Sequence, residues 1–344
     1  MSKAENGIVQ MTEQEYLSHT IIPKTSPHVR MLMLKSEAIA KQYDGSVGRA
    51  YAKLVAAGVV ETATLDDSLH EDKIEAGATR GVIPKYDLTT LVKVGYICAA
   101  DCDSCTRVRQ IGTHEGDLSD EDIKNIGNYF RTHTEREDII LSGGDPMANP
   151  ITTLKLLEEF ENIDSIKIIR VGTRAHHHAP NLFYTKKGTE IVEKLIDINK
   201  NKHVVFQLNF QHADEITLAP ETQQVIQLLT DNFTTVSQTV FLAGINDSYE
   251  EMADLFMLLY RSKVKPYYLY HCDQNLGIEG FVVDLNKERE IYTRLIDTLP
   301  GHAVPTFVID VPGRGKIRVP SMHWDVDMTH LRDYDGNFVD LTGW

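Results

Sequence analysis

The chain has 344 residues, a formal net charge of −15 and 42% hydrophobic residues. This apolar content suffices for a sizeable core in one large or two ordinary domains. The acidic balance argues against a protein that coats nucleic acid or a membrane surface, because both require a basic face. No apolar run approaches the roughly 20 residues that span a bilayer, and the start lacks a signal-peptide pattern. We therefore expect a cytoplasmic protein with a small-molecule partner, no nucleic acid and no membrane.

Residues 1–80 favour helices. The stretch "SEAIAKQYDGSVGRAYAKLVAAGVV" (36–60) places apolar residues near helical spacing. No motif for binding or catalysis occurs before residue 80. We interpret residues 1–80 as an N-terminal helical annex.

From residue 89 a different pattern begins, in which short β-branched apolar runs alternate with longer amphipathic stretches. Helices are predicted within 119–133, where Ser119 and Asp120 are possible caps, and within 248–263. Strand followed by helix, repeated six times, implies a parallel sheet with right-handed crossovers, either open or rolled into a closed or partial barrel. The six predicted strands lie at 89–94, 138–142, 166–172, 203–209, 236–242 and 266–271.

The C-terminal part contains one more apolar run, 303–310, which could extend or cap the sheet. No linker or repeat interrupts the chain, so we predict one core over residues 81–320 and a tail, 321–344, packed on it. The tail segment "DYDGNF" predicts a hairpin with Asp335 and Gly336 at its tip.

Three of the four cysteines, Cys98, Cys102 and Cys105, lie in one loop after the first predicted strand. Such clusters in reducing compartments usually bind metal or perform redox chemistry. Three thiolates from one loop suit three irons of a 4Fe-4S cluster and leave the fourth iron open. Zinc, with Cys272 as a fourth ligand, and plain structural cysteines remain alternatives. Zinc sites favour pairs of C-x2-C, which this spacing does not match.

Other candidate residues also follow predicted strands, where parallel barrels assemble their active sites. The glycine pair in "SGGDP" (142–146) allows close approach of the backbone to a ligand, or forms an ordinary turn. Asp273 and Asp310 each close a strand and would together favour a cationic group. Helix capping and solvation are the simpler interpretations of these two carboxylates.

Two further features are Lys316 and the histidines of "RAHHHAPN" (174–181). Lys316 follows a glycine loop and could form a Schiff base with an aldehyde cofactor, or be a solvated surface lysine. Adjacent residues of an extended loop point in different directions, so His176, His177 and His178 can hardly share one metal. We expect them to make polar loop contacts.

Taken together, seven segments resemble, in order, the signature segments of the lysine 2,3-aminomutase family of radical S-adenosylmethionine enzymes, over residues 75–340. The resemblance implies a partial parallel (β/α)6 barrel. It also implies an isomerase that moves the α-amino group of a basic amino acid to C3, with L-lysine as the first candidate and arginine or ornithine as others. The segments are "CAADCDSCTRVRQIG", "DIILSGGDPM", "IIRVGTRA", "NFQHADEIT", "SQTVFLAGIND", "KPYYLYHCDQNLGIEGF" and "AVPTFVIDVPGRGK".

The resemblance also implies three cofactors: a 4Fe-4S cluster, S-adenosylmethionine and pyridoxal 5′-phosphate. Cys98, Cys102 and Cys105 would hold the cluster, and Lys316 would carry pyridoxal phosphate as a Schiff base. An electron donor such as flavodoxin or ferredoxin would reduce the cluster, and the sequence leaves a homo-oligomer open. The residues implied in binding the two organic cofactors are Ser142, Gly143, Gly144, Asp145, Pro146, Asn209, Gln238, Lys85 and Arg314.

For the substrate, the resemblance assigns Arg107 to the carboxylate, a task suited to its planar fork. Asp273 and Asp310 would hold the distal ammonium group. Two alternatives to an aminomutase of free amino acids stay open: modification of a protein-bound lysine or lysine adduct, and a relative that works without pyridoxal phosphate.

The chain also departs from the family pattern. Two arginines that usually bind the phosphate are replaced by Lys85 and Thr89. Arg314 interrupts the glycine loop, and we predict that it substitutes for a missing phosphate ligand. Asn209 stands where a histidine is common, and the three histidines replace an apolar stretch.

Overall fold

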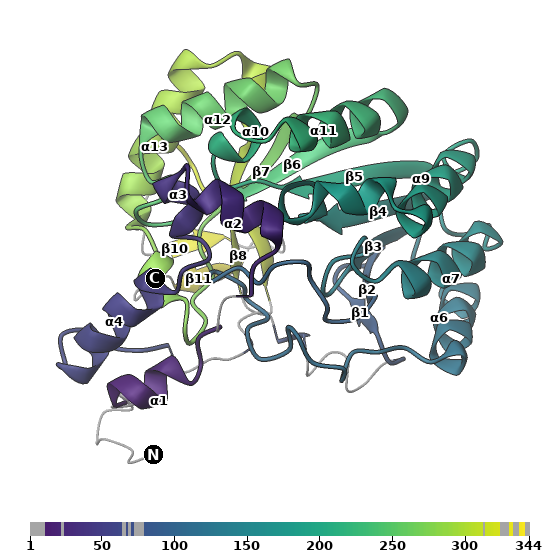
Figure 1. Cartoon of the computed structure of the whole chain (residues 1–344), viewed down its shortest axis with the longest axis horizontal. Helices are drawn as coiled ribbons and strands as arrows, with labels where there is room; N and C mark the ends of the chain where they lie inside the picture. Colours follow the sequence, from purple (N-terminus) through teal and green to yellow (C-terminus); the bar gives the residue numbers. More distant parts are fainter. Residues whose placement is uncertain are drawn as a thin grey trace.

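The computed structural model describes residues 11–21, 24–63, 67, 70–71, 79–311, 314–323, 330–332 and 337–340. Within this part of the chain, nine strands form one sheet in simple chain order (Figure 1). No helix of the described residues has the length and apolar character that crossing a bilayer requires.

Seven neighbouring strands of the sheet are parallel, and the two edge strands, β1 (Val82–Pro84) and β9 (Gly315–Arg318), are antiparallel to their neighbours. All six predicted strands are confirmed, and the run at 303–310 supplies a seventh. The sheet order ends at β1 and β9, so the barrel is partial, as predicted. The parallel strands are β2 (Thr89–Lys93), β3 (Asp138–Ser142), β4 (Ile168–Thr173), β5 (His203–Asn209), β6 (Thr234–Val240), β7 (Lys265–Tyr270) and β8 (Thr306–Val311).

A helix of at least 12 residues follows each parallel strand from β2 to β7, which makes six β/α units. Ser119 rather than Asp120 caps α6, because its side chain accepts a hydrogen bond from the Asp122 amide while Asp122 bonds back to Ser119. The helices are α6 (Asp120–Thr132), α7 (Pro150–Glu161), α9 (Lys186–Ile198), α11 (Pro220–Asn232), α12 (Tyr249–Arg261) and α13 (Leu285–Thr298), with short α8 (Ala175–His178) and α10 (Asp214–Thr217) and the 3-10 turns η1 (Pro180–Tyr184), η2 (Glu279–Phe281) and η3 (Gly301–Ala303).

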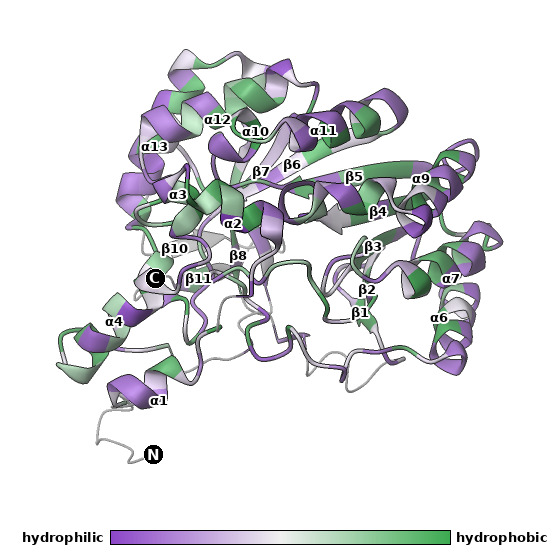
Figure 2. Ribbon diagram, viewed as in Figure 1, coloured by the Kyte–Doolittle hydropathy of each residue, from purple (hydrophilic) through white to green (hydrophobic). Residues whose placement is uncertain are grey.

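The strands divide their side chains between the core and a cavity. In β4, Ile169 and Val171 are fully buried in the main core, whereas Arg170 and Gly172 line the cavity on the other face. Strand β5 is drawn mostly as hydrophobic, whereas the covering helices mix both kinds of residue (Figure 2). Period-two alternation therefore gives each strand an apolar face under the helices and a second face for chemistry.

The N-terminal helices pack beside the barrel (Figure 1). The helical stretch predicted at 36–60 is interrupted between α3 and α4, where Gly45 has a φ of 67°. The Tyr16 hydroxyl donates to Glu279 Oε2 over 2.6 Å and so ties the annex to the loop after β7. These helices are α1 (Glu13–Leu17), α2 (Pro27–Met33), α3 (Glu37–Ala40) and α4 (Ser46–Ala56).

In the tail, β10 (His330–Arg332) and β11 (Phe338–Asp340) pair antiparallel, as a hairpin requires. The predicted tip, Asp335 and Gly336, lies outside the described residues. Val339 packs against the main core. The domain boundaries at residues 80 and 320 stay predictions.

Candidate active site

A cavity of about 360 Å³ opens where the parallel strands end. That volume lies within the range of small-molecule sites. Pro146 is buried beside Asp145 and Arg314 is exposed, and neither lines the cavity. The predicted site residues that do line it are Lys85, Cys98, Cys102, Cys105, Arg107, Ser142, Gly143, Gly144, Asp145, Asn209, Gln238, Asp273, Asp310 and Lys316.

The three clustered cysteines share one wall of this cavity. Burial raises the pKa of each thiol, that of Cys105 to about 12, so the free thiols are protonated at neutral pH. No three His, Cys, Asp or Glu side chains among the described residues converge on one metal ion. Tetrahedral zinc needs such convergence, whereas the cysteines of a 4Fe-4S cluster bind separate irons. Cluster binding therefore does not require the three sulfurs to converge on a single ion.

The glycines of the "SGGDP" segment bring two loops together. Gly143 has a φ of 105°, and a Cβ on Gly144 would lie 2.5 Å from the Ile97 carbonyl oxygen. The Asp145 amide donates to the Ile97 carbonyl over 3.0 Å. This loop thus packs on the chain that leads directly into Cys98, an arrangement that only glycines permit.

The carboxylate of Asp145 holds the loops after β3 and β4 together. It accepts hydrogen bonds from the Met147 amide over 2.9 Å, the Thr173 hydroxyl over 2.8 Å and the Arg174 amide over 2.8 Å. The loops after β3 and β4 are therefore held in one arrangement beside the cysteines.

Lys316 lies on the opposite wall, in β9, as the register partner of Asp310 in β8. Its Nζ is 3.2 Å from Asp310 Oδ2 and 3.2 Å from the Tyr86 hydroxyl, and the rings of Tyr86 and Tyr270 flank it. Burial lowers the pKa of Lys316, but Tyr270, Asp310 and Tyr86 outweigh burial and raise it above its ordinary value. Because it is enclosed and paired, Lys316 is not the solvated surface lysine of the simpler interpretation. An amine between two aromatic rings fits a lysine that carries an aromatic aldehyde.

Asp273 and Asp310 line the same cavity. Burial, followed by the charge of Asp310, raises the pKa of Asp273 to about 7. Two carboxylates that oppose each other's ionisation form a site that a cation would stabilise. This proximity fits the predicted role of the pair better than helix capping does.

Glu71 is a cavity residue that the sequence analysis missed. Its Oε2 accepts from Arg107 Nη2 over 2.8 Å, and its Oε1 accepts from Lys85 Nζ over 2.8 Å. Burial raises the pKa of Glu71, but Arg107 and Lys85 more than offset this and lower it to about 2. The Glu71 carboxylate thus pairs with both Lys85 and Arg107, the two cations that the resemblance assigns to binding the cofactor and the substrate. No motif in "LHEDKIEAG" (69–77) indicates this.

Arg170 is a second missed residue and lies beside Thr89. Its Nε donates to Asp138 Oδ1 over 2.9 Å, and the Thr89 hydroxyl donates to Asp138 Oδ2 over 2.8 Å. A cation from β4 therefore lines the cavity near the position where the family pattern has an arginine. A polar residue at a cavity-facing position of an apolar strand was the signal available in the sequence.

The expectation of an extended loop at the three histidines is wrong, because they form the short helix α8 and are buried. The expected polar contact is present at His178, whose Nε2 lies 3.1 Å from the Tyr43 hydroxyl. Burial lowers the pKa of His176 to about 3 and lowers those of His177 and His178 as well. Among the described residues, neither ring nitrogen of His177 has a hydrogen-bond partner. The amide of Ala175 donates to the Thr173 hydroxyl, which turns the chain into this helix directly after β4.

Comparison with known proteins agrees with this geometry. The profile of a family described as "4Fe-4S single cluster domain" matches residues 90–199, which include the three cysteines. A protein of Aquifex aeolicus named "Putative L-lysine 2,3-aminomutase" is 36% identical over 76% of this chain and 68% of its own length. The L-lysine 2,3-aminomutase of Clostridium subterminale is 31% identical over 80% of this chain and 65% of its own length.

A more distant relative, the glutamate 2,3-aminomutase of Clostridioides difficile, is 26% identical over 75% of this chain and 60% of its own length. The chain thus spans between three fifths and about two thirds of the length of these curated relatives. The extent of these matches, the cluster profile and the half-barrel with its cysteine loop lead to one conclusion: this chain belongs to the lysine 2,3-aminomutase family.

Proposed function

We propose that the protein is a radical S-adenosylmethionine 2,3-aminomutase that uses pyridoxal phosphate and acts on a basic amino acid, with L-lysine as the first candidate. The observation that carries this proposal is the location of Asp273 and Asp310 in the same cavity as the three cysteines and Lys316. Once Lys316 engages the aldehyde, a distal ammonium group would give this pair of carboxylates a new cationic partner.

The bound cofactors would supply a carbon-centred radical, formed when an electron from the reduced cluster cleaves a carbon–sulfur bond of S-adenosylmethionine, and an aldehyde that can hold the migrating nitrogen. Cys98, Cys102 and Cys105 would hold the cluster, and the loop at 142–146 would form the wall beside it. Lys316 would hold the pyridoxal group between Tyr86 and Tyr270. Asn209, Gln238, Lys85 and Arg170 would provide polar contacts around it.

Two internal ion pairs must open before substrate binds. Lys316 forms an ion pair with Asp310. Covalent attachment of the aldehyde to Lys316 would break this pair and leave Asp310 available to bind the distal ammonium together with Asp273. Glu71 occupies Arg107, so the substrate carboxylate would exchange with the Glu71 carboxylate. Each exchange replaces one charge-assisted hydrogen bond by another of the same kind.

The same geometry argues against glutamate as the substrate. A glutamate side chain would bring a third carboxylate to Asp273 and Asp310, and like charges in a buried site repel strongly. Lysine, arginine and ornithine all carry a distal cation and differ in length.

The test is an anaerobic assay. The protein is reconstituted with iron and sulfide, supplied with pyridoxal phosphate, S-adenosylmethionine and dithionite, and offered lysine, arginine, ornithine or glutamate separately. We expect a β-amino acid from one basic substrate by mass spectrometry after derivatisation, and none from glutamate. Product from glutamate alone would contradict the assignment of the two aspartates. Cleavage of S-adenosylmethionine without product from any of the four would contradict the substrate class.

A further inference from the structure

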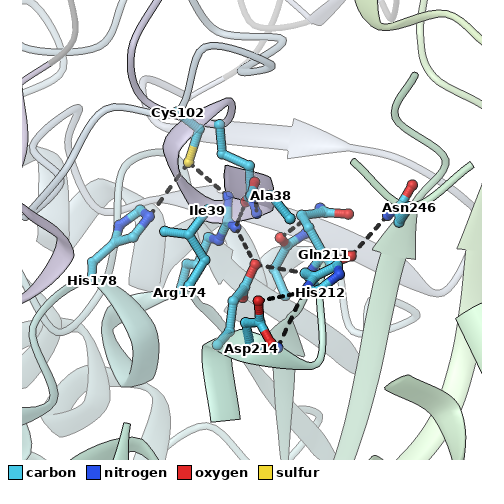
Figure 3. A network of polar contacts seen from close by, with 12 residues as sticks. Ala38, Ile39, Cys102, Arg174, His178, Gln211, His212, Asp214 and Asn246 are labelled. Carbon is cyan, nitrogen blue, oxygen red and sulfur yellow. Dashed lines mark hydrogen bonds and ion pairs between the residues drawn. The ribbon is translucent and has the colours of Figure 1, made fainter. Parts of the chain in front are cut away.

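A polar network surrounds the sulfur of Cys102 (Figure 3). Arg174 follows β4 and is 9% exposed, and its Nη1 lies 2.9 Å from Cys102 Sγ. His178, from α8, approaches the same sulfur with Nε2 at 3.4 Å. Among the three clustered cysteines, Cys102 is thus in contact with a guanidinium group.

Arg174 is held from two further sides. Its Nη2 donates to Glu215 Oε1 over 3.0 Å and also to Gln42 Oε1. Glu215 lies in α10, after β5, and is fully buried. Its Oε1 also accepts a hydrogen bond from the Gln211 amide. Since these partners fix Nη2, Nη1 remains directed at the sulfur (Figure 3).

The annex contributes to this network. Gln42 lies just after α3, and the neighbouring Tyr43 places its hydroxyl 3.1 Å from His178 Nε2 and its ring 5.5 Å from the Arg174 guanidinium carbon. The surroundings of Cys102 are therefore assembled from the annex and from the loops after β4 and β5. Arg174 and His178 line the same cavity as Lys316, whereas Gln42, Tyr43 and Glu215 are not among its lining residues.

We propose that Arg174 donates a charge-assisted hydrogen bond to the Cys102 thiolate when that cysteine binds iron, and that Arg174 thereby raises the reduction potential of the cluster. Gln42 and Glu215 act as positioning residues for Arg174. The inference rests on the proposed function, because it requires a cluster at the three cysteines.

The physical reason is the charge of the reduced state. A low-potential one-electron donor adds one electron and no bond changes, so the cluster and its thiolates become more negative by one charge. A fixed cation and an N–H donor at a ligand sulfur stabilise the more negative state. The buried Glu215 opposes this charge, but it bonds to Nη2 while the sulfur is in direct contact with Nη1, so the nearer cation has the larger effect.

The test measures the midpoint potential of the reconstituted cluster by a redox titration followed by electron paramagnetic resonance, without pyridoxal phosphate or amino acid. Arg174→Gln should retain iron and sulfide. Its cluster should have a midpoint potential about 59 mV more negative than that of the wild type, which corresponds to a roughly tenfold weaker equilibrium for one-electron reduction. Arg174→Lys should shift less. Equal potentials in the wild type and Arg174→Gln at equal iron content would overturn the inference.

Arg174→Gln leaves Glu215 as an unpaired buried charge, which can prevent folding. Arg174→Gln combined with Glu215→Gln replaces the ion pair by two amides and should show a smaller negative shift, because the opposing charge of Glu215 is removed as well. Arg289→Gln is the matched control, because it removes an arginine that is also buried but bonds to the Pro320 and Ser321 carbonyl groups at the other end of the chain. It should leave the potential unchanged.

The outcomes separate the two proposals. A wild-type protein that assembles no cluster would overturn both the proposed function and this inference. A wild-type cluster whose potential does not depend on Arg174 would overturn the inference alone.

Discussion

The two walls of the cavity handle charge in opposite ways. On the cysteine wall, burial raises the pKa values of three thiols, and Arg174 is the cation in contact with a sulfur. On the lysine wall, Lys316 pairs with Asp310, and Glu71 joins Lys85 to Arg107 of the cysteine loop. The thiols of the first wall ionise when metal binds, whereas the second wall already pairs Lys316 with Asp310 and Lys85 with Glu71. We therefore expect ligands to bind the cysteine wall by forming new contacts (addition) and to bind the lysine wall by displacing existing ion pairs (exchange).

The largest expected effect tests the cysteine wall. Changing Cys98, Cys102 or Cys105 singly to Ala should remove the cluster and with it all cleavage of S-adenosylmethionine, since each cysteine supplies one iron ligand. Iron and sulfide analysis after anaerobic reconstitution measures this directly.

Cys272→Ala is the matched control. Cys272 lies in an apolar cluster with Leu242, Ile245, Ile278 and Phe281, and we expect its iron content to equal that of the wild type. Iron lost from Cys272→Ala would assign a metal ligand to this cysteine and contradict the three-cysteine cluster.

The second effect tests the lysine wall. Lys316→Ala should abolish covalent attachment of pyridoxal phosphate, because no other described lysine lines the cavity between two aromatic rings. Borohydride reduction followed by peptide mapping detects the attached group. Lys287→Ala, at an exposed ion pair of α13, serves as the control and should remain labelled at Lys316. Wild-type protein that never becomes labelled would favour a relative that works without pyridoxal phosphate.

Much of this contrast was predictable from the sequence. Strand and helix periods predicted the parallel sheet, and the positions after the strands predicted that Cys98 and Asp273 lie at one edge, because parallel strands deliver their carboxyl ends to one edge. The partial barrel and the role of Lys316, which lies in the antiparallel edge strand β9, came from the family resemblance. The burial of α8 was not predictable, since three adjacent histidines form a polar sequence and only tertiary packing buries them. The alternation of β4 indicates that Arg170 faces away from the core, but its partner Asp138 is 32 residues away, and the partner Arg107 of Glu71 is 36 residues away, so no local pattern encodes these pairings.

A third prediction concerns the cation site on the lysine wall. Asp273→Asn should raise the KM for a basic substrate roughly 30-fold, about 2 kcal/mol, because it removes one of two buried charge contacts to the distal ammonium. Steady-state kinetics with lysine measures this, and Asp247→Asn, at a peripheral ion pair, is the control. An unchanged KM would contradict the role of Asp273.

The raised pKa of Asp273 should also make the free energy of unfolding depend on pH. Its pKa is raised from 3.8 to about 7, so the folded state holds the proton more tightly than the unfolded chain does. Stability should therefore fall as pH rises from about 4 to about 7, by about 4 kcal/mol or less. Denaturant unfolding at pH 5 and pH 8 should show this fall in the wild type and a smaller one in Asp273→Asn. Equal falls in both proteins would contradict the raised pKa.

The smallest effect tests whether binding on the lysine wall is exchange. Glu71→Gln removes the carboxylate that competes for Arg107, so the KM for a free amino acid should fall by roughly two- to tenfold, whereas Glu71→Asp, which keeps the charge, should fall less. The free energy of unfolding should drop by about 3 kcal/mol, since Lys85 and Arg107 lose a buried partner. That loss should shrink below pH 4, because the wild-type Glu71 carboxylate, with its pKa lowered to about 2, is itself protonated as the pH falls through that value. A KM that rises in Glu71→Gln would show that Glu71 orients Arg107 for the substrate instead of competing with it, and the lysine wall would then bind by addition, as the cysteine wall does.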